Sequence, residues 1–232
     1  MLTSGTCIVA IRTPDEIVIG ADSFENVCDG KQNIVCKIGI VGDIVFATAG
    51  LSRVFDDETF EEHFNVREIV RGEIDPQVPI EENLRRIVSA VAVKAKAYFA
   101  IKLDRERLNF LKGLNKPLEI ILGRYEENTL RIAAGRLMRK APDDSLELGA
   151  SVLRPCPFPG LLHVECYLAG AYDAILQDFE FHRLMETPDL VGTVEDAILI
   201  QARKDESVGG PIRIIQVTES GVRWRREREG CG

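Results

Sequence analysis

The first fifty residues contain four short apolar runs that are separated by turn residues. The four runs are residues 6–11, 17–21, 33–40 and 44–49. The first two are rich in β-branched side chains, and the polar link between them carries Pro14 and Asp15, which favour a tight turn. The last two flank a segment centred on Gly42. Two successive hairpins are therefore predicted, and with them an antiparallel sheet at the start of the fold.

Helical periodicity replaces the alternating pattern after Gly50. Apolar residues that recur at three- and four-residue steps predict a long helix with one apolar face over residues 79–102. A weaker pattern of the same period predicts a helix over residues 51–69. A third helix is predicted over residues 194–204, with Thr193 as its N-cap.

Five later runs are typical of strands, and their order indicates the fold class. They are residues 117–123, 130–134, 161–169, 212–217 and 222–224. Clusters of strands thus alternate with clusters of helices, which is typical of an α+β fold whose antiparallel sheets pack against helices in layers. The length of 232 residues suits one domain.

Composition and charge exclude several classes of function. The longest apolar stretch, residues 38–51, is shorter than the roughly 20 residues of a membrane span, so no membrane partner is expected. The formal net charge of −8 argues against nucleic acid as a partner, because phosphate binding requires clustered Lys and Arg. One basic run, residues 223–228, is interleaved with acid and is interpreted as a frayed or oligomer-facing tail.

The six cysteines show no metal-binding pattern. No two of them form a C-x-x-C pair, and none has the histidine spacing of a zinc site, so no metal or other cofactor is expected. Free thiols in a reducing compartment are the interpretation that this pattern favours. Residues 1–5 also lack the basic and apolar parts of a secretory signal, which makes a cytoplasmic location the expectation.

Four short segments near the start of the chain occur together in one known family. They are Gly5-Thr6-Cys7-Ile8-Val9-Ala10, Ile17-Val18-Ile19-Gly20-Ala21-Asp22-Ser23, Cys36-Lys37-Ile38 and Ala47-Thr48-Ala49-Gly50. With these segments the chain strongly resembles a proteasome β subunit of the bacterial and archaeal type. Thr6 precedes Asp22 by sixteen residues, the family's interval between nucleophile and aspartate. Near the far end, Asp205 and the pair Gly209-Gly210 are similar to the family's helix-end aspartate and its following Gly-Gly.

The resemblance implies a fold, a leader and a function. The implied fold is a four-layer αββα sandwich of two antiparallel sheets, that of N-terminal-nucleophile hydrolases. Residues 1–5 would be a short leader, residues 6–232 a single domain, and cleavage between Gly5 and Thr6 would be autocatalytic. The implied function is that of a threonine peptidase that self-associates into rings or stacked rings. Its substrates would be peptides or unfolded proteins, with an ATPase regulator as a further, unidentified partner.

The same resemblance assigns the chemical roles of the first residues. Thr6 would be the nucleophile, and its α-amine, once freed from Gly5, would have a pKa of about 7.7–8.0 and act as the base. Lys37, held charged by Asp22, would lower the pKa of the Thr6 hydroxyl.

Three further residues receive roles from the resemblance. Asp205 would orient the amine, and the N–H of Gly50 would stabilise the oxyanion. Thr48 would line the first specificity pocket. A small polar side chain at that position implies no strong preference for aromatic or charged substrates.

Two departures from the family pattern affect the proton relay. Where the family has a serine directly before Gly-Gly, this chain has Val208, and Ser207 lies one position earlier. Where the family has a Gly-Ser-Gly turn, the counterpart is Ala169-Gly170-Ala171, which carries no hydroxyl. These changes are compatible with a slower enzyme, with a relay through water and Ser207, or with a catalytically inactive subunit.

Each candidate residue also has a purely structural interpretation. Asp22 could cap a turn, Lys37 could be an edge lysine whose stem lies along the surface, and Asp205 could end a helix. Cys7 is the alternative nucleophile, but strand alternation places its side chain opposite that of Thr6, which favours core packing. Three functions therefore stay open: a threonine peptidase, an inactive structural subunit of the same fold, and an amidohydrolase that acts on a small amide.

Overall fold

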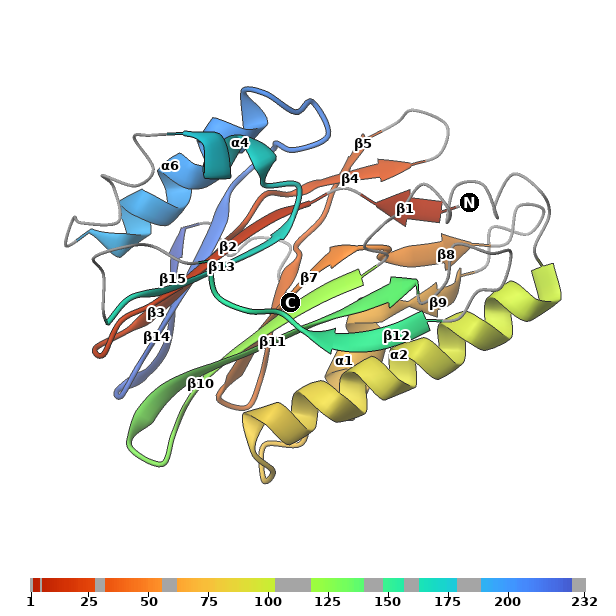
Figure 1. Ribbon diagram of the computed structural model, residues 1–232, viewed down its shortest axis with the longest axis horizontal. Helices are drawn as coiled ribbons and strands as arrows, with labels where there is room; N and C mark the ends of the chain where they lie inside the picture. The colour runs from red at the N-terminus through yellow and green to blue at the C-terminus, as the bar shows by residue number, and fades with distance from the viewer. Residues whose placement is uncertain are drawn as a thin grey trace.

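The computed structural model shows a mixed fold in which sheets pack against helices (Figure 1). The residues that it describes are 2–4, 6–27, 32–55, 62–102, 118–139, 148–156, 163–178 and 189–226. Their helices are α1 (Val66–Glu73), α2 (Ile80–Lys102), α4 (Asp173–Gln177) and α6 (Leu190–Ala202).

The strands of these residues form three antiparallel sheets of five strands each. Sheet I has the order β13 (Glu165–Gly170), β2 (Cys7–Arg12), β3 (Ile17–Ala21), β14 (Arg213–Thr218) and β15 (Gly221–Arg226). Sheet II has the order β12 (Leu148–Val152), β11 (Thr129–Arg139), β10 (Leu118–Glu126), β7 (Ile44–Gly50) and β6 (Ile38–Val41). Sheet III has the order β5 (Gln32–Ile34), β4 (Phe24–Val27), β1 (Leu2–Ser4), β8 (Arg53–Phe55) and β9 (Glu62–Asn65).

Sheets I and II pack face to face around a central apolar core. Ile8 and Ile19 of sheet I and Ala47 and Ile121 of sheet II belong to this core, and all four are fully buried. Because side chains alternate between the faces of a strand, the neighbours of these residues point outward and need cover on the other face.

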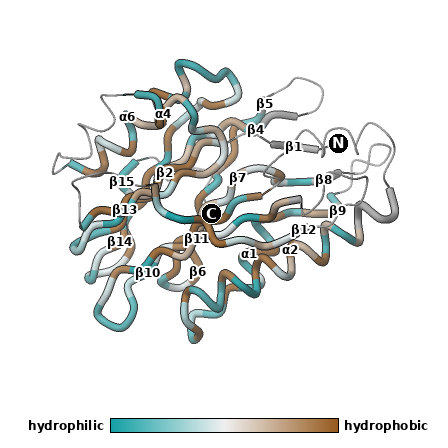
Figure 2. The backbone as a smooth tube through the Cα atoms, viewed as in Figure 1, coloured by the Kyte–Doolittle hydropathy of each residue, from teal (hydrophilic) through white to brown (hydrophobic). Residues whose placement is uncertain are grey.

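Helices supply that cover on the outer faces of both sheets. α1 and α2 pack on sheet II through residues such as Val70 and Ile87, and α4 and α6 pack on sheet I through Ile175 and Val194 (Figure 1). Figure 2 shows that hydrophobic residues concentrate along the packed strands, whereas the turn of the β10–β11 hairpin is hydrophilic. The result is an αβ sandwich with an additional small sheet at one end.

The structure confirms the long helix and most of the expected strands. α2 spans Ile80–Lys102, and strands β2, β3 and β7 lie where the apolar runs predicted them. The helix expected over residues 51–69 is wrong in its first part, because α1 begins only at Val66 and the preceding described residues form β8 and β9. β8 pairs with β1 on one side and β9 on the other, and such pairing overrides a weak local helical period.

Several element boundaries differ from expectation, for example β11, which extends to Arg139, and β13, which begins only at Glu165; two further differences have a clear cause. The run expected as one strand over residues 33–40 is divided into β5 and β6, because β5 pairs with β4 whereas β6 pairs with β7. Helix α6 begins at Leu190 and not at residue 194, since the Asp189 side chain caps it by accepting from the Gly192 amide at 3.0 Å. Thr193, the expected cap, lies inside the helix and donates its hydroxyl to the Asp189 carbonyl.

Sheet III was not expected, and it contains part of the predicted leader. In β1, Thr3 pairs with Val27 of β4 on one side and with Arg53 of β8 on the other. An extended peptide that joins a sheet in this way is held mainly by its main chain. Residues 2–4 therefore lie extended between β4 and β8.

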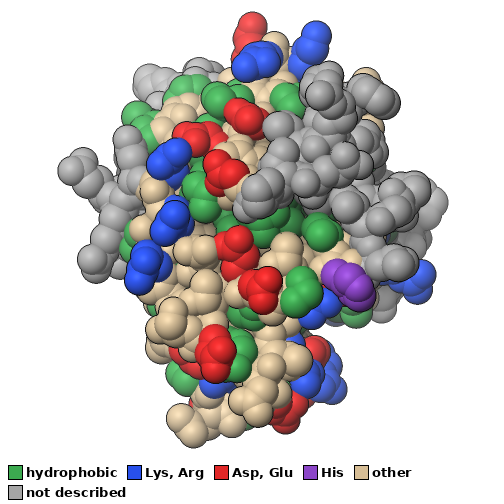
Figure 3. Space-filling model, turned by 90° about the vertical axis from the view of Figure 1, so that its left-hand side faces the viewer, with side chains coloured by type: hydrophobic (Ala, Val, Ile, Leu, Met, Phe, Trp, Pro, Cys, Tyr) green, Lys and Arg blue, Asp and Glu red, His purple; other side chains and the backbone are tan. Residues whose placement is uncertain are grey.

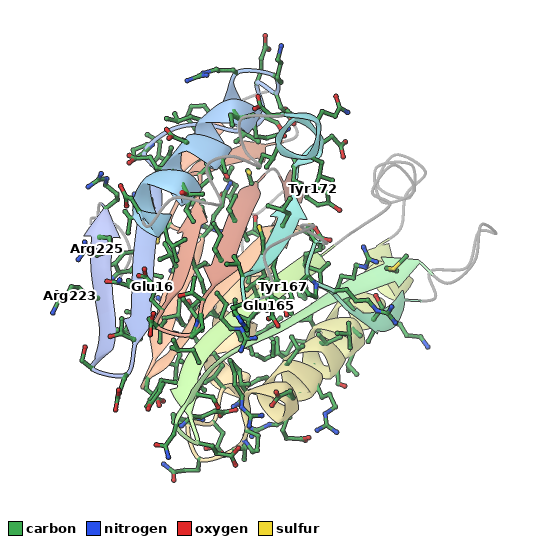
Figure 4. The ribbon with its side chains drawn as sticks, turned by 60° about the vertical axis from the view of Figure 1, so that its left-hand side comes forward. Glu16, Glu165, Tyr167, Tyr172, Arg223 and Arg225 are labelled. Carbon is green, nitrogen blue, oxygen red and sulfur yellow. The ribbon has the colours of Figure 1, made fainter. Side chains whose placement is uncertain are left out.

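The basic run near the C-terminus is part of a sheet. Arg223 and Arg225 lie on β15, which pairs with β14, so this part is not a frayed tail; residues 227–228 lie outside the described residues. Both arginines project outward from the edge of sheet I (Figure 4). Acidic and basic side chains are interspersed over this side of the molecule (Figure 3). The described helices are too short or too polar to cross a bilayer.

Candidate active site

Thr6 and Asp22 are neighbours because β2 and β3 form a hairpin. β2 begins directly after Thr6, β3 ends directly before Asp22, and the register pairs Ile8 with Ala21. The Cys7 amide donates to Oδ1 of Asp22 at 2.8 Å, and the Asp22 amide donates to the Cys7 carbonyl at 3.2 Å. The carboxylate is therefore fixed beside the backbone that follows Thr6.

Lys37 forms a buried ion pair with Asp22. Its Nζ lies 2.9 Å from Oδ1 of Asp22, and the two side chains are 6% and 0% exposed. Burial lowers the pKa of the Lys37 ammonium, while the Asp22 carboxylate opposes this shift by charge attraction and a hydrogen bond. The segment between β5 and β6 positions Lys37, whose carbonyl accepts from the Thr48 amide at 3.2 Å.

The second carboxylate oxygen of Asp22 connects the two ends of the chain. Oδ2 accepts from the amides of Phe24 and Gly209, each at 3.1 Å. The Phe24 ring packs so closely on the Gly-Gly pair that a Cβ on Gly209 would lie 2.6 Å from it. The Gly209-Gly210 motif and Asp22 therefore form one unit, although the sequence places them far apart.

Thr6 is buried, with 4% of the residue exposed, and its carbonyl is held by the turn that follows β13. The Ala171 amide donates to the Thr6 carbonyl at 2.8 Å. Gly170 has φ +78°, and a Cβ there would lie 2.0 Å from the Thr6 carbonyl oxygen. Only glycine meets both conditions, so this turn is built for close approach to Thr6.

Glu119 supports the same turn from sheet II, and sequence reasoning missed it. Its Oε2 accepts from the Gly170 amide at 2.6 Å, the residue is 1% exposed, and Arg136 lies 4.0 Å from its Oε1. A carboxylate within the apolar strand β10 was the signal that could have found it, because buried acids are rare without a specific partner.

The other predicted residues lie around this centre. Asp205 follows α6, and its Oδ1 accepts from the amide and the hydroxyl of Ser207 at 2.9 and 2.6 Å. Gly50 ends β7 with φ +95°, a conformation that favours glycine. Thr48, two residues earlier on β7, is 5% exposed.

A small cavity of about 20 Å³ brings several of these residues together. Thr6, Lys37 and Thr48 all line it. The other described residues that line it are Glu25, Val35, Cys36, Ser52, Arg53, Asn65 and Arg67. Sequence reasoning missed the charged members of this second group, since they come from β4, β8 and α1, and no spacing in the sequence relates them.

The cysteines are divided between free thiols and a disulfide. Cys7 packs under α6, on the opposite face of β2 from Ile8, and burial followed by the Asp22 charge raises the pKa of its thiol. A thiol of raised pKa is a poor nucleophile at neutral pH. Cys156 and Cys166 are also free, whereas Cys36 is disulfide-bonded, which corrects the expectation of free thiols for that residue.

Two larger hollows, of about 300 and 410 Å³, lie toward the far end of β2, roughly 20 Å from Thr6 at the usual rise of a strand. Arg12 and Glu165 line both of them. Glu165 accepts from Arg12 at 2.7 Å and from the Tyr167 hydroxyl at 3.2 Å, and Figure 4 shows Glu165 and Tyr167 close together on β13. Arg12, Glu165 and Tyr167 thus hydrogen-bond to one another, and we assign these two hollows no binding role.

The site combines the Thr6 hydroxyl and the Lys37 ammonium on one cavity, and the Asp22 carboxylate pairs with that ammonium. This set suits attack of a hydroxyl on a carbonyl carbon, because the ammonium stabilises developing negative charge on oxygen. Within the part of the chain that the structure describes, no three His, Cys, Asp or Glu side chains are grouped so as to hold a metal ion.

Comparisons with known proteins bear on the fold. No protein-family model and no curated protein matches the chain. Among solved structures it is similar to Anbu (ancestral beta-subunit) from Yersinia bercovieri, with a TM-score of 0.55 and 14% identity, over 96% of this chain and 88% of that chain. At this identity the likeness concerns the fold alone.

Proposed function

We propose that this chain is a threonine peptidase of the proteasome type, with the four-layer αββα arrangement, that uses Thr6 as its nucleophile. The observation that carries the proposal is the buried Lys37–Asp22 pair, at 2.9 Å, on the cavity that Thr6 lines. Burying two charges costs free energy that a well-packed apolar pair would not. Such a pair beside a hydroxyl therefore favours a chemical role.

The first reaction is removal of residues 1–5. The Thr6 hydroxyl attacks the Gly5 carbonyl carbon, the C–N bond between the two residues breaks, and the hydroxyl proton passes to the Thr6 nitrogen. Water then hydrolyses the ester, which leaves a carboxylate on Gly5 and a free α-amine on Thr6. The ammonium of Lys37 stabilises the negative charge that develops on oxygen.

Peptide hydrolysis follows the same steps: attack by the hydroxyl, cleavage of the C–N bond and hydrolysis of the ester. The freed amine, with an ordinary pKa of about 7.7–8.0, accepts the hydroxyl proton as Thr6 attacks the substrate carbonyl. The N–H of Gly50 stabilises the oxyanion, Asp205 orients the amine, and Thr48 lines the pocket for the substrate side chain. The substrate amine leaves with the proton, and water releases the acyl group from Thr6.

The proposal includes assembly into rings or stacked rings. The similarity to a protein named as an ancestral beta-subunit supports it. A ring would enclose the sites and restrict access to peptides and unfolded proteins. An ATPase regulator is a further proposed partner.

Intact mass and peptide turnover test the proposal. The wild-type protein should lose residues 1–5 and cleave fluorogenic peptides, whereas Thr6→Ala should keep the leader, apart from the initiator Met, and be inactive. Thr218→Ala, in the closing hairpin of sheet I, is the matched control and should behave as the wild type. Equal turnover by the wild type and Thr6→Ala would show that Thr6 is not the nucleophile.

Light scattering tests the proposed assembly into rings. It should give a mass well above that of a monomer.

One observation favours a second candidate, an inactive structural subunit. Val208 stands where the family has a serine, is 3% exposed, and packs in the apolar cluster beneath α6, and the Ala169-Gly170-Ala171 turn also carries no hydroxyl. A ring-sized particle that retains the leader and cleaves no peptide would select this candidate.

A further inference from the structure

The cavity beside Thr6 has walls of predominantly positive charge. Lys37, Arg53 and Arg67 line it, and Glu25 is the acid among its described lining residues. Whether the cavity favours an anion depends on which of these charges already has a partner inside the fold.

Two of the three cations are neutralised within the protein. Lys37 pairs with Asp22 at 2.9 Å. Arg53 Nε lies 3.6 Å from Oε1 of Glu25, and the same oxygen accepts from the Ser52 hydroxyl at 2.6 Å. Glu25, which is only 3% exposed, is therefore already engaged by two groups of the cavity wall.

Arg67 is the charge that these pairs leave uncompensated. Its Nε is buried without a hydrogen-bond partner, and one terminal nitrogen reaches the Ile38 carbonyl only at 3.5 Å. Among the described residues, no carboxylate forms an ion pair with it. Burial, then the charges of Arg71 and Arg53, lowers the pKa of Arg67 to about 10. A bound anion would oppose each of these effects.

The size of the cavity limits what that anion can be. About 20 Å³ admits only a small group, so a carboxylate tip suits the cavity better than an aromatic or long aliphatic side chain. A guanidinium binds such a tip with charge-assisted hydrogen bonds, which are the strong ones. Thr6 lines the same cavity, so an occupant lies next to the proposed nucleophile.

We infer that this cavity is the subsite for an acidic side chain, that of an Asp or Glu residue directly before the bond that Thr6 attacks, and that Arg67 recognises it. The inference rests on the proposed function and adds the substrate class to it. It also revises the weak substrate preference that Thr48 alone implies, because Thr48 is one of several residues that line the cavity and the acidic preference arises from Arg67 of α1.

Matched peptides test the inference in the full-length protein. Fluorogenic tetrapeptides that differ only at the residue before the scissile bond carry Asp, Asn, Glu, Gln, Leu or Arg there. Asp and Asn have nearly the same shape, so their ratio of kcat/KM isolates the charge. We expect a preference of about tenfold or more for Asp over Asn, and for Glu over Gln. A ratio near one, or faster cleavage after Leu or Arg, overturns the inference.

Two variants distinguish recognition of the acid by Arg67 from a general effect of positive charge on α1. Arg67→Met keeps the length of the side chain and should bring the Asp/Asn ratio close to one. Arg71→Met removes a charge one turn along α1, where Arg71 pairs with Glu68 at 3.2 Å, and should keep the wild-type ratio. An Asp preference that survives in Arg67→Met shows that Arg67 does not recognise the acid.

A binding measurement distinguishes failure of this inference from failure of the proposed function. If the wild type keeps its leader and cleaves no peptide, the proposed function fails, and the subsite is then tested without chemistry. Calorimetry with end-capped pentapeptide amides that carry Asp or Asn should still show tighter binding of the Asp peptide, and loss of that difference in Arg67→Met. Equal affinity of the wild type for both peptides overturns the subsite itself.

Discussion

The Gly209 amide donates to Oδ2 of Asp22 across 3.1 Å, although 187 positions separate the two residues in the sequence. The other oxygen of the same carboxylate accepts from Lys37 at 2.9 Å and from the Cys7 amide at 2.8 Å. Asp22 thus ties the start of β2, the segment before β6 and the segment after α6 to one point. Asp22 therefore holds the backbone directly after Thr6, while the Ala171 amide holds the Thr6 carbonyl.

Asp22→Asn should lower the free energy of unfolding by about 3 kcal/mol, because it leaves the buried Lys37 ammonium without its counter-charge. Urea unfolding at pH 7 measures the change. Asp15→Asn, an exposed acid in the β2–β3 turn, is the control and should change the free energy of unfolding by less than about 0.5 kcal/mol. An Asp22→Asn protein as stable as the wild type would show that the pair contributes nothing to the fold.

Gly170→Ala should destabilise the protein by about 2 kcal/mol or more and prevent leader removal. The new Cβ would lie 2.0 Å from the Thr6 carbonyl oxygen at a φ of +78°, so the turn must move away from Thr6. Gly72→Ala is the matched control: Gly72 lies in α1, a Cβ there meets nothing within 4 Å, and the protein should gain about 0.5–1 kcal/mol. Urea unfolding and intact mass provide the two measurements. Normal processing of Gly170→Ala would contradict the close approach.

The N-terminal hairpin could be predicted because its signals are local. Alternating β-branched residues and a polar turn are sufficient for β2 and β3, and the Thr6–Asp22 interval follows once these strands pair. The Lys37–Asp22 contact could also be predicted, but only through the resemblance to a family, since nothing local relates residues on either side of β4 and β5.

The walls of the cavity could not be predicted for the same physical reason that the helix over residues 51–69 was wrong. β8 carries Arg53 and takes its conformation from pairing with β1, which lies about fifty positions earlier in the chain. A periodicity of a few residues contains no information about such a partner. Once β8 forms, α1 starts at Val66 and brings Arg67 to the cavity beside Thr6, a consequence of tertiary structure alone.

Stability should fall between about pH 10 and pH 12 because of Tyr167. Burial, with a contribution from Glu165, raises the pKa of Tyr167 to about 12, whereas an unfolded tyrosine ionises near pH 10. In this window the unfolded chain binds fewer protons than the folded one, so the free energy of unfolding decreases as pH rises, by at most about 2 kcal/mol. Urea unfolding across the window should show a shallower decline for Tyr167→Phe. Parallel curves for the two proteins would contradict a raised pKa in the folded state.

Arg67→Met should stabilise the protein by about 1 kcal/mol at pH 7. The pKa of Arg67 is lowered to about 10, chiefly by burial, so the charged form is disfavoured in the folded state relative to the unfolded one. For a base with a lowered pKa, this destabilisation is complete below pH 10 and is relieved only as pH rises further, so a neutral side chain removes it at pH 7. Arg71→Met, which breaks the pair with the exposed Glu68, should change stability by less than about 0.5 kcal/mol. Urea unfolding of both variants measures these changes. A loss of stability in Arg67→Met would mean that the Arg67 charge stabilises the fold. A gain, together with loss of the Asp preference, would mean that the fold tolerates a destabilising charge because substrate binding requires it.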